Sequence, residues 1–230
     1  FNMKSNLMVR LNNTSAERLK NELLTFPNIE SVAGASHVPA AGETHGNGFK
    51  KDLDEKDWTN LNTFSVDEDY LKNMQVDLVA GEFYKPENGN SNKNFIVINE
   101  QALKVLQFEN ATEALSKEVI YQNDSSRKQI IGVVKDYNHS QLFTDIAPLA
   151  LMYEPESIRI LQVRYSGDRD RAVTSVETAW TKVNPDLKVD HKDIEAEIKF
   201  FYNTVFGDVV HILGVIASLA IMISCHGLLG

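Results

Sequence analysis

The stretch from residue 212 to residue 230 constrains this chain most strongly. It reads ILGVIASLAIMISCHGLLG and contains no Asp, Glu, Lys or Arg. This composition is typical of a membrane span, and its aliphatic residues together favour insertion by roughly 3–5 kcal/mol. The alternative is a buried C-terminal helix of a soluble domain, but such a helix is expected to stop at a cap, whereas this run continues to residue 230. We therefore predict that residues 205–230 begin a transmembrane helix in contact with membrane lipid.

Small residues share one face of this predicted helix. Gly214 and Ser218 are four residues apart, and Ala217 widens the same face. Such a smooth face suits close packing against another membrane helix. Tyr202 precedes the apolar run, where aromatic side chains anchor helices among lipid headgroups. We predict that Gly214, Ala217 and Ser218 form a helix-packing face and that Tyr202 is an interfacial anchor.

The charges before the apolar run indicate the side of the membrane on which the chain folds. Between residues 190 and 211 acidic and basic residues are mixed, without a basic cluster. Cytoplasmic flanks of membrane helices are typically rich in Lys and Arg. We therefore predict that residues 1–204 form an extracytoplasmic domain.

Overall charge and cysteine content exclude further classes. The chain has 23 Lys and Arg against 32 Asp and Glu, a net charge of −9. Because acidic clusters repel phosphate backbones, nucleic acid is not an expected partner. The single cysteine, Cys225, excludes an internal disulfide framework, so apolar burial must stabilise the fold.

Two segments of the chain show the same order of predicted elements. Each reads strand, helix, strand, and the expected elements cover residues 6–11, 14–26 and 29–38 in the first segment and residues 158–165, 168–183 and 187–190 in the second. Thr14 and Glu17 form the capping box expected to start the first helix. We predict an α+β fold in which these βαβ units build a ferredoxin-like porter lobe, about residues 1–48 plus 135–204.

The residues between the two units predict a smaller β-rich lobe, inserted at about residues 49–134. A Gly-rich loop at residues 39–48 leads into it, and Ser65 with Glu68 forms the capping box expected to start its first helix. Its expected strands cover residues 59–65, 76–80, 95–98, 118–121 and 129–134, and its expected helices cover residues 67–74 and 100–106.

The sequence contains few signals for chemistry. It lacks the phosphate-binding loop, the zinc-protease motif and the hydrolase elbow. The best metal-like cluster is His37, Glu43 and His45, although its loop spacing is loose for zinc. Asp136 and His139 suit an acid–base pair, but we favour a polar turn after a strand, because no nucleophile or second carboxylate accompanies them. We therefore predict no enzymatic activity and no catalytic, cofactor-binding or metal-binding residues.

Short segments spread along the whole chain carry a family resemblance. They are VDEDYL at residues 66–71, VAGEF at 79–83, VINEQA at 97–102, IIGVVKDY at 130–137 and ISCHGLLG at 223–230. In this order, ahead of an apolar helix, they resemble the extracytoplasmic core domain of MacB-like, FtsX-like ABC transporter permeases, especially those of Bacteroidetes-type bacteria. The chain departs from the family pattern at Glu82, where Arg often follows Gly, and at Ser116, where Gly commonly precedes Lys. We therefore infer nothing about these local turns from the family.

The resemblance implies a periplasmic domain between two transmembrane helices of the bacterial inner membrane. Such permeases pair with a separate or fused ATP-binding cassette ATPase and transmit ATP-driven helix movement to the periplasm, where antimicrobials, peptides or lipoproteins are exported or released. The resemblance also implies a permease homodimer or heterodimer and, in some systems, a periplasmic adaptor. The alternative is a ligand-sensing ectodomain of a membrane-bound sensor kinase or chemoreceptor, which also lies between two membrane helices.

Overall fold

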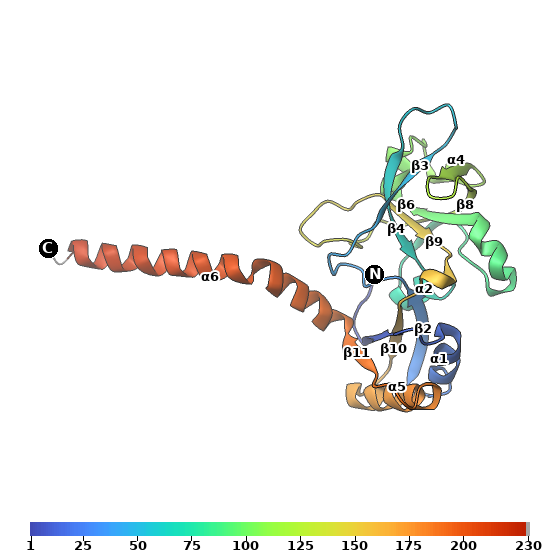
Figure 1. The fold of residues 1–230 in the computed structure, drawn as a ribbon. Coiled ribbons are helices and arrows are strands. Elements are labelled where there is room, and N and C mark those ends of the chain that lie inside the picture. The colour runs from blue at the N-terminus through green and yellow to red at the C-terminus, as the bar shows by residue number, and fades with distance from the viewer. Residues whose placement is uncertain (229–230) are drawn as a thin grey trace.

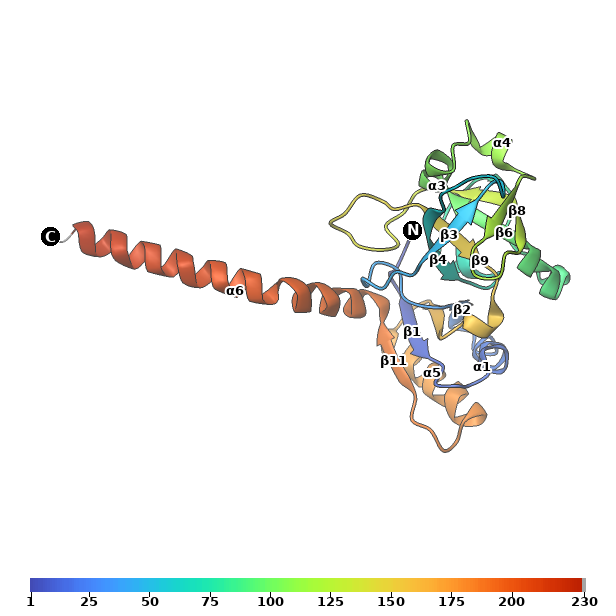
Figure 2. The ribbon, with the colours of Figure 1, turned by 45° about the horizontal axis from the view of Figure 1, so that its top comes forward.

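Two lobes pack against each other, and a long helix, α6 (Ile194–Leu228), projects away from both (Figure 1). This computed structural model describes residues 1–228 and has a mixed α and β fold, as the sequence predicts. A view turned by 45° shows the same separation, with the last strand leading into the base of α6 (Figure 2). The protruding helix is thus attached to the body through its first turns.

The first lobe is built on a four-stranded antiparallel sheet with the order β11-β1-β10-β2. Its elements are β1 (Asn6–Arg10), α1 (Ala16–Leu23), β2 (Ile29–Ala35), β10 (Ile160–Tyr165), α5 (Arg169–Val183) and β11 (Asp190–Asp193). The two strand–helix–strand units therefore share one sheet. Strand alternation turns one face of this sheet toward α1 and α5. The resulting cluster includes Leu7, Val9, Leu19, Leu23, Leu161, Val163, Val176 and Trp180.

The second lobe is built on a sheet that closes on itself. Its strand order is β5-β8-β6-β9-β4-β3-β7. Because β7 also pairs with the first part of β8, the six strands from β8 to β7 form a closed ring. Strand β5 pairs with the last part of β8. The strands are β3 (Gly46–Lys50), β4 (Thr59–Ser65), β5 (Leu78–Gly81), β6 (Phe95–Asn99), β7 (Glu118–Tyr121), β8 (Arg127–Val134) and β9 (Leu149–Met152). Closure satisfies strand edges that an open sheet leaves unpaired.

Short helices cover the closed sheet and join it to the first lobe. They are α2 (Tyr70–Met74), α3 (Glu100–Val105) and α4 (Ala111–Ala114), with 3-10 segments at Pro86–Asn94 and Pro155–Ser157. The side chain of Asn99 accepts the Ala102 N–H at 3.0 Å and so caps α3, as expected of Asn before a helix.

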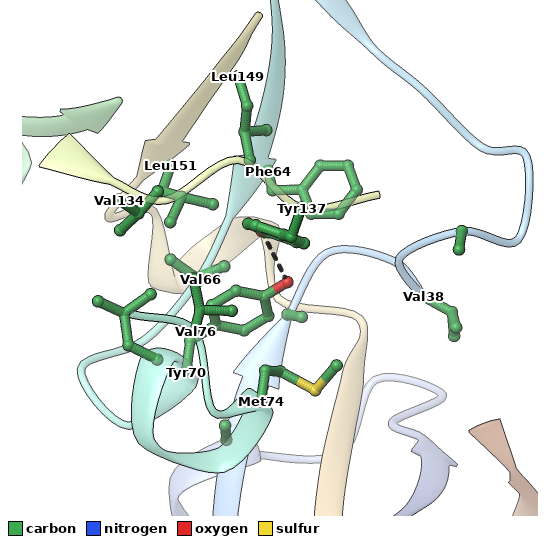
Figure 3. Packing of buried hydrophobic residues seen from close by; sticks show 14 of the residues in the cluster. Val38, Phe64, Val66, Tyr70, Met74, Val76, Val134, Tyr137, Leu149 and Leu151 are labelled. Atoms are coloured by element: carbon green, nitrogen blue, oxygen red, sulfur yellow. Dashed lines mark hydrogen bonds between the residues drawn. The ribbon is translucent and has the colours of Figure 1, made fainter. Parts of the chain in front are cut away.

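An apolar core lies between the two lobes (Figure 3). It combines residues of the four-stranded sheet with residues of the closed sheet and of α2, including Met8, Ala33, Ile160, Phe64, Val66, Tyr70, Met74, Leu149 and Leu151. The hydroxyls of Tyr70 and Tyr137 lie 3.2 Å apart within this core. Ile194 and Ile198 of α6 are buried in the same cluster. The lobes therefore pack as one body around a shared interior.

Polar groups also join the lobes. The fully buried Asn73 of α2 donates to the Ser31 carbonyl at 3.2 Å and to the Gln162 carbonyl at 3.1 Å, and its oxygen accepts from Asn6 at 2.7 Å. Arg164 of β10 donates to the Asn73 carbonyl at 2.6 Å. These hydrogen bonds fix α2 on the four-stranded sheet.

An ion pair supplements these hydrogen bonds at the edge of the lobe interface. Lys20 of α1 lies 2.8 Å from Asp67 and 2.7 Å from Asp69, in the segment before α2. Burial alone would lower the pKa of Lys20, but the two carboxylates raise it above its usual value. Asp67 also accepts the Gly34 N–H of β2 at 2.6 Å, so one carboxylate holds two elements of the first lobe.

The boundary of the inserted lobe lies later than predicted. Strand β9 pairs in parallel with β4 and antiparallel with β6, so residues up to Met152 extend the closed sheet past the end at about residue 134 that the sequence predicts. The first strand of this lobe, β3, begins at Gly46, and its sheet has seven strands against four in the first lobe. The apolar run LALM of β9 is too short for its periodicity to indicate a strand.

Three predicted element ends are also wrong. Ser15, not Thr14, caps α1 by accepting the Arg18 N–H at 3.3 Å. Helix α2 begins after Asp69, because Ser65 instead donates from the end of β4 to Glu154 at 2.7 Å. The last strand begins at Asp190, after a turn in which the Leu187 carbonyl accepts from Trp180. Tertiary partners override the local signals in each case.

Helix α6 is bent. Within the described part of the chain no single helix is long and apolar enough to cross a membrane. The segments Ile194–Gly207 and Ile212–Ser218, inclined to each other by 48°, satisfy length and composition together. Leu229 and Gly230, which end the apolar run, lie outside the described residues.

Replacing Asn73 with alanine is expected to lower the free energy of unfolding by about 2–4 kcal/mol, because it leaves buried partners at the lobe interface unsatisfied. Urea denaturation of the chain in detergent micelles, followed by far-UV circular dichroism, measures this change. The exposed Asn90→Ala variant is the control. A loss no larger than that of the control would show that Asn73 does not stabilise the interface.

Candidate functional site at the base of helix α6

The first turn of α6 is anchored in the interior of the body. Ile194 and Ile198 are one helical turn apart and therefore share a face, and both are buried in the core between the lobes. Glu195 and Glu197 lie in the same turn, where carboxylates interact favourably with the helix N-terminus. Because β11 ends at Asp193, helix and sheet are joined without a flexible linker.

Ion pairs hold this turn against the four-stranded sheet. Arg10 at the end of β1 lies 3.2 Å from Glu197 and 3.3 Å from Asp190. Lys192 lies 2.9 Å from the second oxygen of Glu197, whose side chain is only 15% exposed. Partly exposed pairs of this kind are worth about 0.2–1 kcal/mol each. Their main effect is to set the direction in which α6 leaves the sheet.

The loop between β2 and β3 contacts the second turn of α6 through Gly42. This glycine has a φ of 83°, a conformation that costs little only for glycine. A Cβ at this position would lie 2.1 Å from the Phe201 ring. The Phe201 ring therefore packs directly against the backbone of the loop.

The connection between β8 and β9 contacts the same part of α6 from the second lobe. The Leu142 N–H donates to the hydroxyl of Tyr202 at 2.5 Å. The Phe143 ring lies 6.0 Å from the Tyr202 ring and 5.1 Å from the Phe206 ring, both edge to face. Helix α6 is thus held by both lobes over its first turns.

A cavity of about 970 Å³ adjoins these contacts. Its walls come from the end of β1, the loop after β2, the segment before β10 and the first turns of α6, and include Arg10, His37, Glu43, Ile158, Arg159, Glu197 and Phe201. Its lining mixes apolar side chains with charges of both signs. The space lies where α6 meets the body.

Two buried imidazoles contact the Phe64 ring, His37, which lines this cavity, and His139. His139 is hydrogen bonded at both nitrogens, to the Tyr137 carbonyl at 3.2 Å and to the Asn62 amide at 3.3 Å. Burial lowers the pKa of His139 to about 4. Burial, with the imidazoles of His45 and His139 nearby, lowers the pKa of His37 to about 4. Both rings are therefore neutral at neutral pH.

The sequence-based hypotheses about chemistry have different outcomes. His37 and His45 do lie together, with ring centres 5.4 Å apart, but the described residues include no group of three or more His, Cys, Asp or Glu placed to hold a metal. Asp136 instead accepts from the backbone and side chain of Gln101, at 3.0 and 2.8 Å, and neither nitrogen of His139 bonds to it. The polar turn after β8 therefore explains Asp136.

The predicted membrane-related residues lie along α6. Tyr202 is half-buried in the contacts described above. Gly214, Ala217 and Ser218 are exposed further along the helix, and the Ser218 hydroxyl donates to the Gly214 carbonyl at 2.8 Å. Their proposed roles toward lipid and a second helix remain predictions. Sequence analysis missed the roles of Arg10 and Leu142, whose partners are distant in the chain, although it did note the loop that contains Gly42.

Solved structures of extracytoplasmic domains of transporters share the fold of this chain. The periplasmic region of MacB from Actinobacillus actinomycetemcomitans is 15% identical with a TM-score of 0.61, over 87% of this chain and 94% of that chain. The extracellular domain of the noncanonic ABC-type transporter YknZ from Gram-positive bacteria is 12% identical with a TM-score of 0.56, over 81% and 98%.

A domain of a protein described as a permease, from Porphyromonas gingivalis, is 13% identical with a TM-score of 0.53, over 81% of this chain and 84% of that chain. No family model and no curated protein sequence matches the chain. At these identities the likeness establishes the fold. The expected fold of a MacB-like periplasmic domain of an ABC permease is therefore confirmed. The sensor alternative gains no support from these structures.

Acid is expected to destabilise the chain through its buried imidazoles. Because their pKa is lower in the folded than in the unfolded chain, the unfolded chain binds more protons between about pH 6.5 and 4, and stability falls as pH decreases through this range. The His139→Gln variant retains a donor and an acceptor but cannot be protonated, so its loss over the range is expected to be smaller by up to about 3 kcal/mol. Urea denaturation at several pH values tests this; equal losses in both proteins would contradict it.

Substituting alanine for Gly42 is expected to loosen the base of α6, because the new Cβ would displace the Phe201 ring. Hydrogen–deuterium exchange of residues 194–204 measures the effect, which should be a faster exchange. The matched control is Gly167→Ala, since Gly167 has a similar φ of 75° and no atom within 4 Å of the added Cβ. If both variants exchange alike, backbone strain alone accounts for the change and the Phe201 contact is unimportant.

Proposed function

We propose that this chain is the non-catalytic periplasmic domain of an ABC transporter permease subunit, and that it couples ATP-driven helix motion to the export or release of a substrate. The observation that supports this most directly is the attachment of α6 to both lobes. Its first turn lies in their shared core, and the next turns contact Gly42 of the β2–β3 connection and Leu142 of the β8–β9 connection. A helix held in this way passes a change of its tilt to the whole body.

The membrane part of the proposal rests on the composition of α6. From Ile212 onward the helix enters the run without acidic residues, lysine or arginine, which favours insertion into lipid. In this arrangement Tyr202 is an interfacial anchor, while Gly214, Ala217 and Ser218 pack against another membrane helix. Residues 1–204 are then periplasmic, and residues 205–230 begin the transmembrane helix in the bacterial inner membrane.

The cavity beside α6 supports the proposal that this helix shifts relative to the two lobes. Protein interiors are close-packed, so a helix packed on all sides changes its angle only by disrupting its neighbours. The space of about 970 Å³ next to Glu197 and Phe201 leaves room for the helix to shift while Ile194 stays buried. A conformational change of this kind usually takes a helix from one packed arrangement to another.

The partners follow from what the chain lacks and from its likeness to transporter domains. Its sequence contains no phosphate-binding loop, so ATP hydrolysis is assigned to a separate or fused ATP-binding cassette ATPase. A permease homodimer or heterodimer, with a periplasmic adaptor in some systems, completes the assembly. The substrate class proposed is an antimicrobial, a peptide or a lipoprotein.

We further propose that the four-stranded lobe is a ferredoxin-like porter lobe. The strand order β11-β1-β10-β2 and the two strand–helix–strand units support this assignment. In the porter lobe the sheet face opposite α1 and α5 packs on the second lobe, so movement of α6 at the sheet edge reaches the lobe interface directly.

Inserting Gly-Gly between Asn203 and Thr204 is expected to uncouple ATP hydrolysis from export, because glycine weakens the helix at the point where it leaves the body. The permease reconstituted with its ATPase is assayed for both activities. Hydrolysis should continue while export falls. The control carries the same insertion between Asp54 and Glu55, in the exposed hairpin between β3 and β4. Unchanged export in the Asn203 variant would count against coupling through α6.

A further inference from the structure

Two loops that contact the base of α6 also bind each other. They are the β2–β3 loop and the β8–β9 connection, and both lie on the side from which α6 leaves the body (Figures 1 and 2). The Ala40 N–H donates to the His139 carbonyl at 2.8 Å, and the Gly42 N–H donates to the Ser140 carbonyl at 3.3 Å. Because these hydrogen bonds join backbone to backbone, displacement of one loop displaces the other.

Each loop contacts α6 through a residue of its own. Gly42 of the β2–β3 loop packs against the Phe201 ring, and the Leu142 N–H of the β8–β9 connection donates to the Tyr202 hydroxyl. The joined loops thus contact two neighbouring residues of the helix. We call these loops together the clasp, which consists of residues 36–45 and 139–146.

His139 joins the two loops and is itself buried, with 1% of its surface exposed. Its Nδ1 lies 3.2 Å from the Tyr137 carbonyl, and because a carbonyl only accepts, this nitrogen carries the proton. Its Nε2 then has a lone pair, which accepts from the Asn62 amide at 3.3 Å. The neutral imidazole is therefore satisfied at both nitrogens while the clasp is closed.

Protonation of His139 would break this arrangement. A second proton, on Nε2, would face the N–H of the Asn62 amide, so that two donors oppose each other and one hydrogen bond is lost. The charge of the imidazolium would also be buried without a hydrogen-bonded counter-ion, which costs free energy. Moving the ring into water avoids both costs, and this movement displaces the carbonyl to which Ala40 is bound.

Burial dominates the environment of this imidazole. The groups around it are Asn62 and Phe64 of β4, Asp136 and Tyr137 of its own connection, and His37 and His45 of the β2–β3 loop. The charge of Asp136 favours protonation of His139, but burial outweighs it and lowers the pKa of His139 to about 4. Between about pH 6.5 and 4 the ring therefore binds a proton mainly when it leaves its buried position.

We propose that the clasp is an acid-sensitive switch, which holds α6 while His139 is neutral and releases it when His139 is protonated. Opening frees Phe201 and Tyr202 from the two loops, while Ile194 still holds the first turn of α6 in the core. The contacts that form the switch lie within the chain and do not require α6 to lie in a bilayer. The switch and the proposed function can therefore fail separately.

Hydrogen–deuterium exchange of the whole chain in detergent micelles, at several pH values, tests the switch. The quantity compared is the protection factor, which removes the pH dependence of intrinsic exchange. An open clasp binds one more proton at His139 than a closed one, so protection of the clasp is expected to fall by up to about tenfold per pH unit between about pH 6.5 and 4. Both loops should lose protection together, and residues 169–183 of α5 should keep theirs.

Two variants assign the effect to His139. His139→Gln retains a donor and an acceptor but takes up no proton, so the fall in protection should be smaller by up to about tenfold per pH unit. Asn62→Asp places a carboxylate opposite Nε2, which accepts from the protonated ring, so its clasp should stay protected to lower pH. The matched control is His191→Gln, since His191 is a half-buried imidazole of β11 outside the clasp, and it should behave as the parent chain does.

Several results would overturn the proposal. An equal fall in the parent and in His139→Gln would show that this imidazole does not hold the clasp closed. Loosening of Asn62→Asp at the same pH as the parent would contradict the role of the opposed donors. If α5 loses protection together with the clasp, acid unfolds the chain and opens no local switch. If only one loop loosens, the two loops do not act as a unit.

Discussion

The burial of Ile194 and Ile198 in the core between the lobes is the interaction on which the architecture depends. These residues give the two lobes and α6 a common interior, so none of the three moves without disturbing the others. The polar groups around this apolar contact determine the orientation of the neighbouring helices. Arg10 and Glu197 orient the helix, and Asn73 orients α2 on the four-stranded sheet. Apolar burial thus supplies the attachment, and ion pairs and hydrogen bonds supply its geometry.

The elements that could be predicted from sequence are those whose patterns are local. Strand β10 alternates between apolar and polar residues, and α5 is capped by Asp168, whose side chain accepts the Arg171 N–H. Strand β9 could not be predicted, since four apolar residues in a row carry no period, and its place depends on partners in β4 and β6. Closure of the second sheet through β7 and β8 is likewise a long-range pairing.

The site at the base of α6 was predictable only in part. Tyr202 was singled out for its place before an apolar run, yet its contact with Leu142 joins residues 60 positions apart. The contact of Gly42 with Phe201 also leaves no local sign, because a glycine-rich loop has many possible causes. Likeness to solved structures at 12–15% identity fits this picture. A buried core tolerates exchange of apolar residues when volume and pattern are kept, so the fold persists while individual side chains differ.

The bend in α6 makes the two ends of the helix behave differently. A straight rod that turns about its own axis leaves every point of that axis in place. In α6 the two segments are inclined by 48°, so the axis of one segment is not the axis of the other. Spinning the Ile212–Ser218 segment about its own axis swings the Ile194–Gly207 segment around a cone, and the body fixed to that segment swings with it. A small twist at one end thereby becomes a wide lateral displacement at the other.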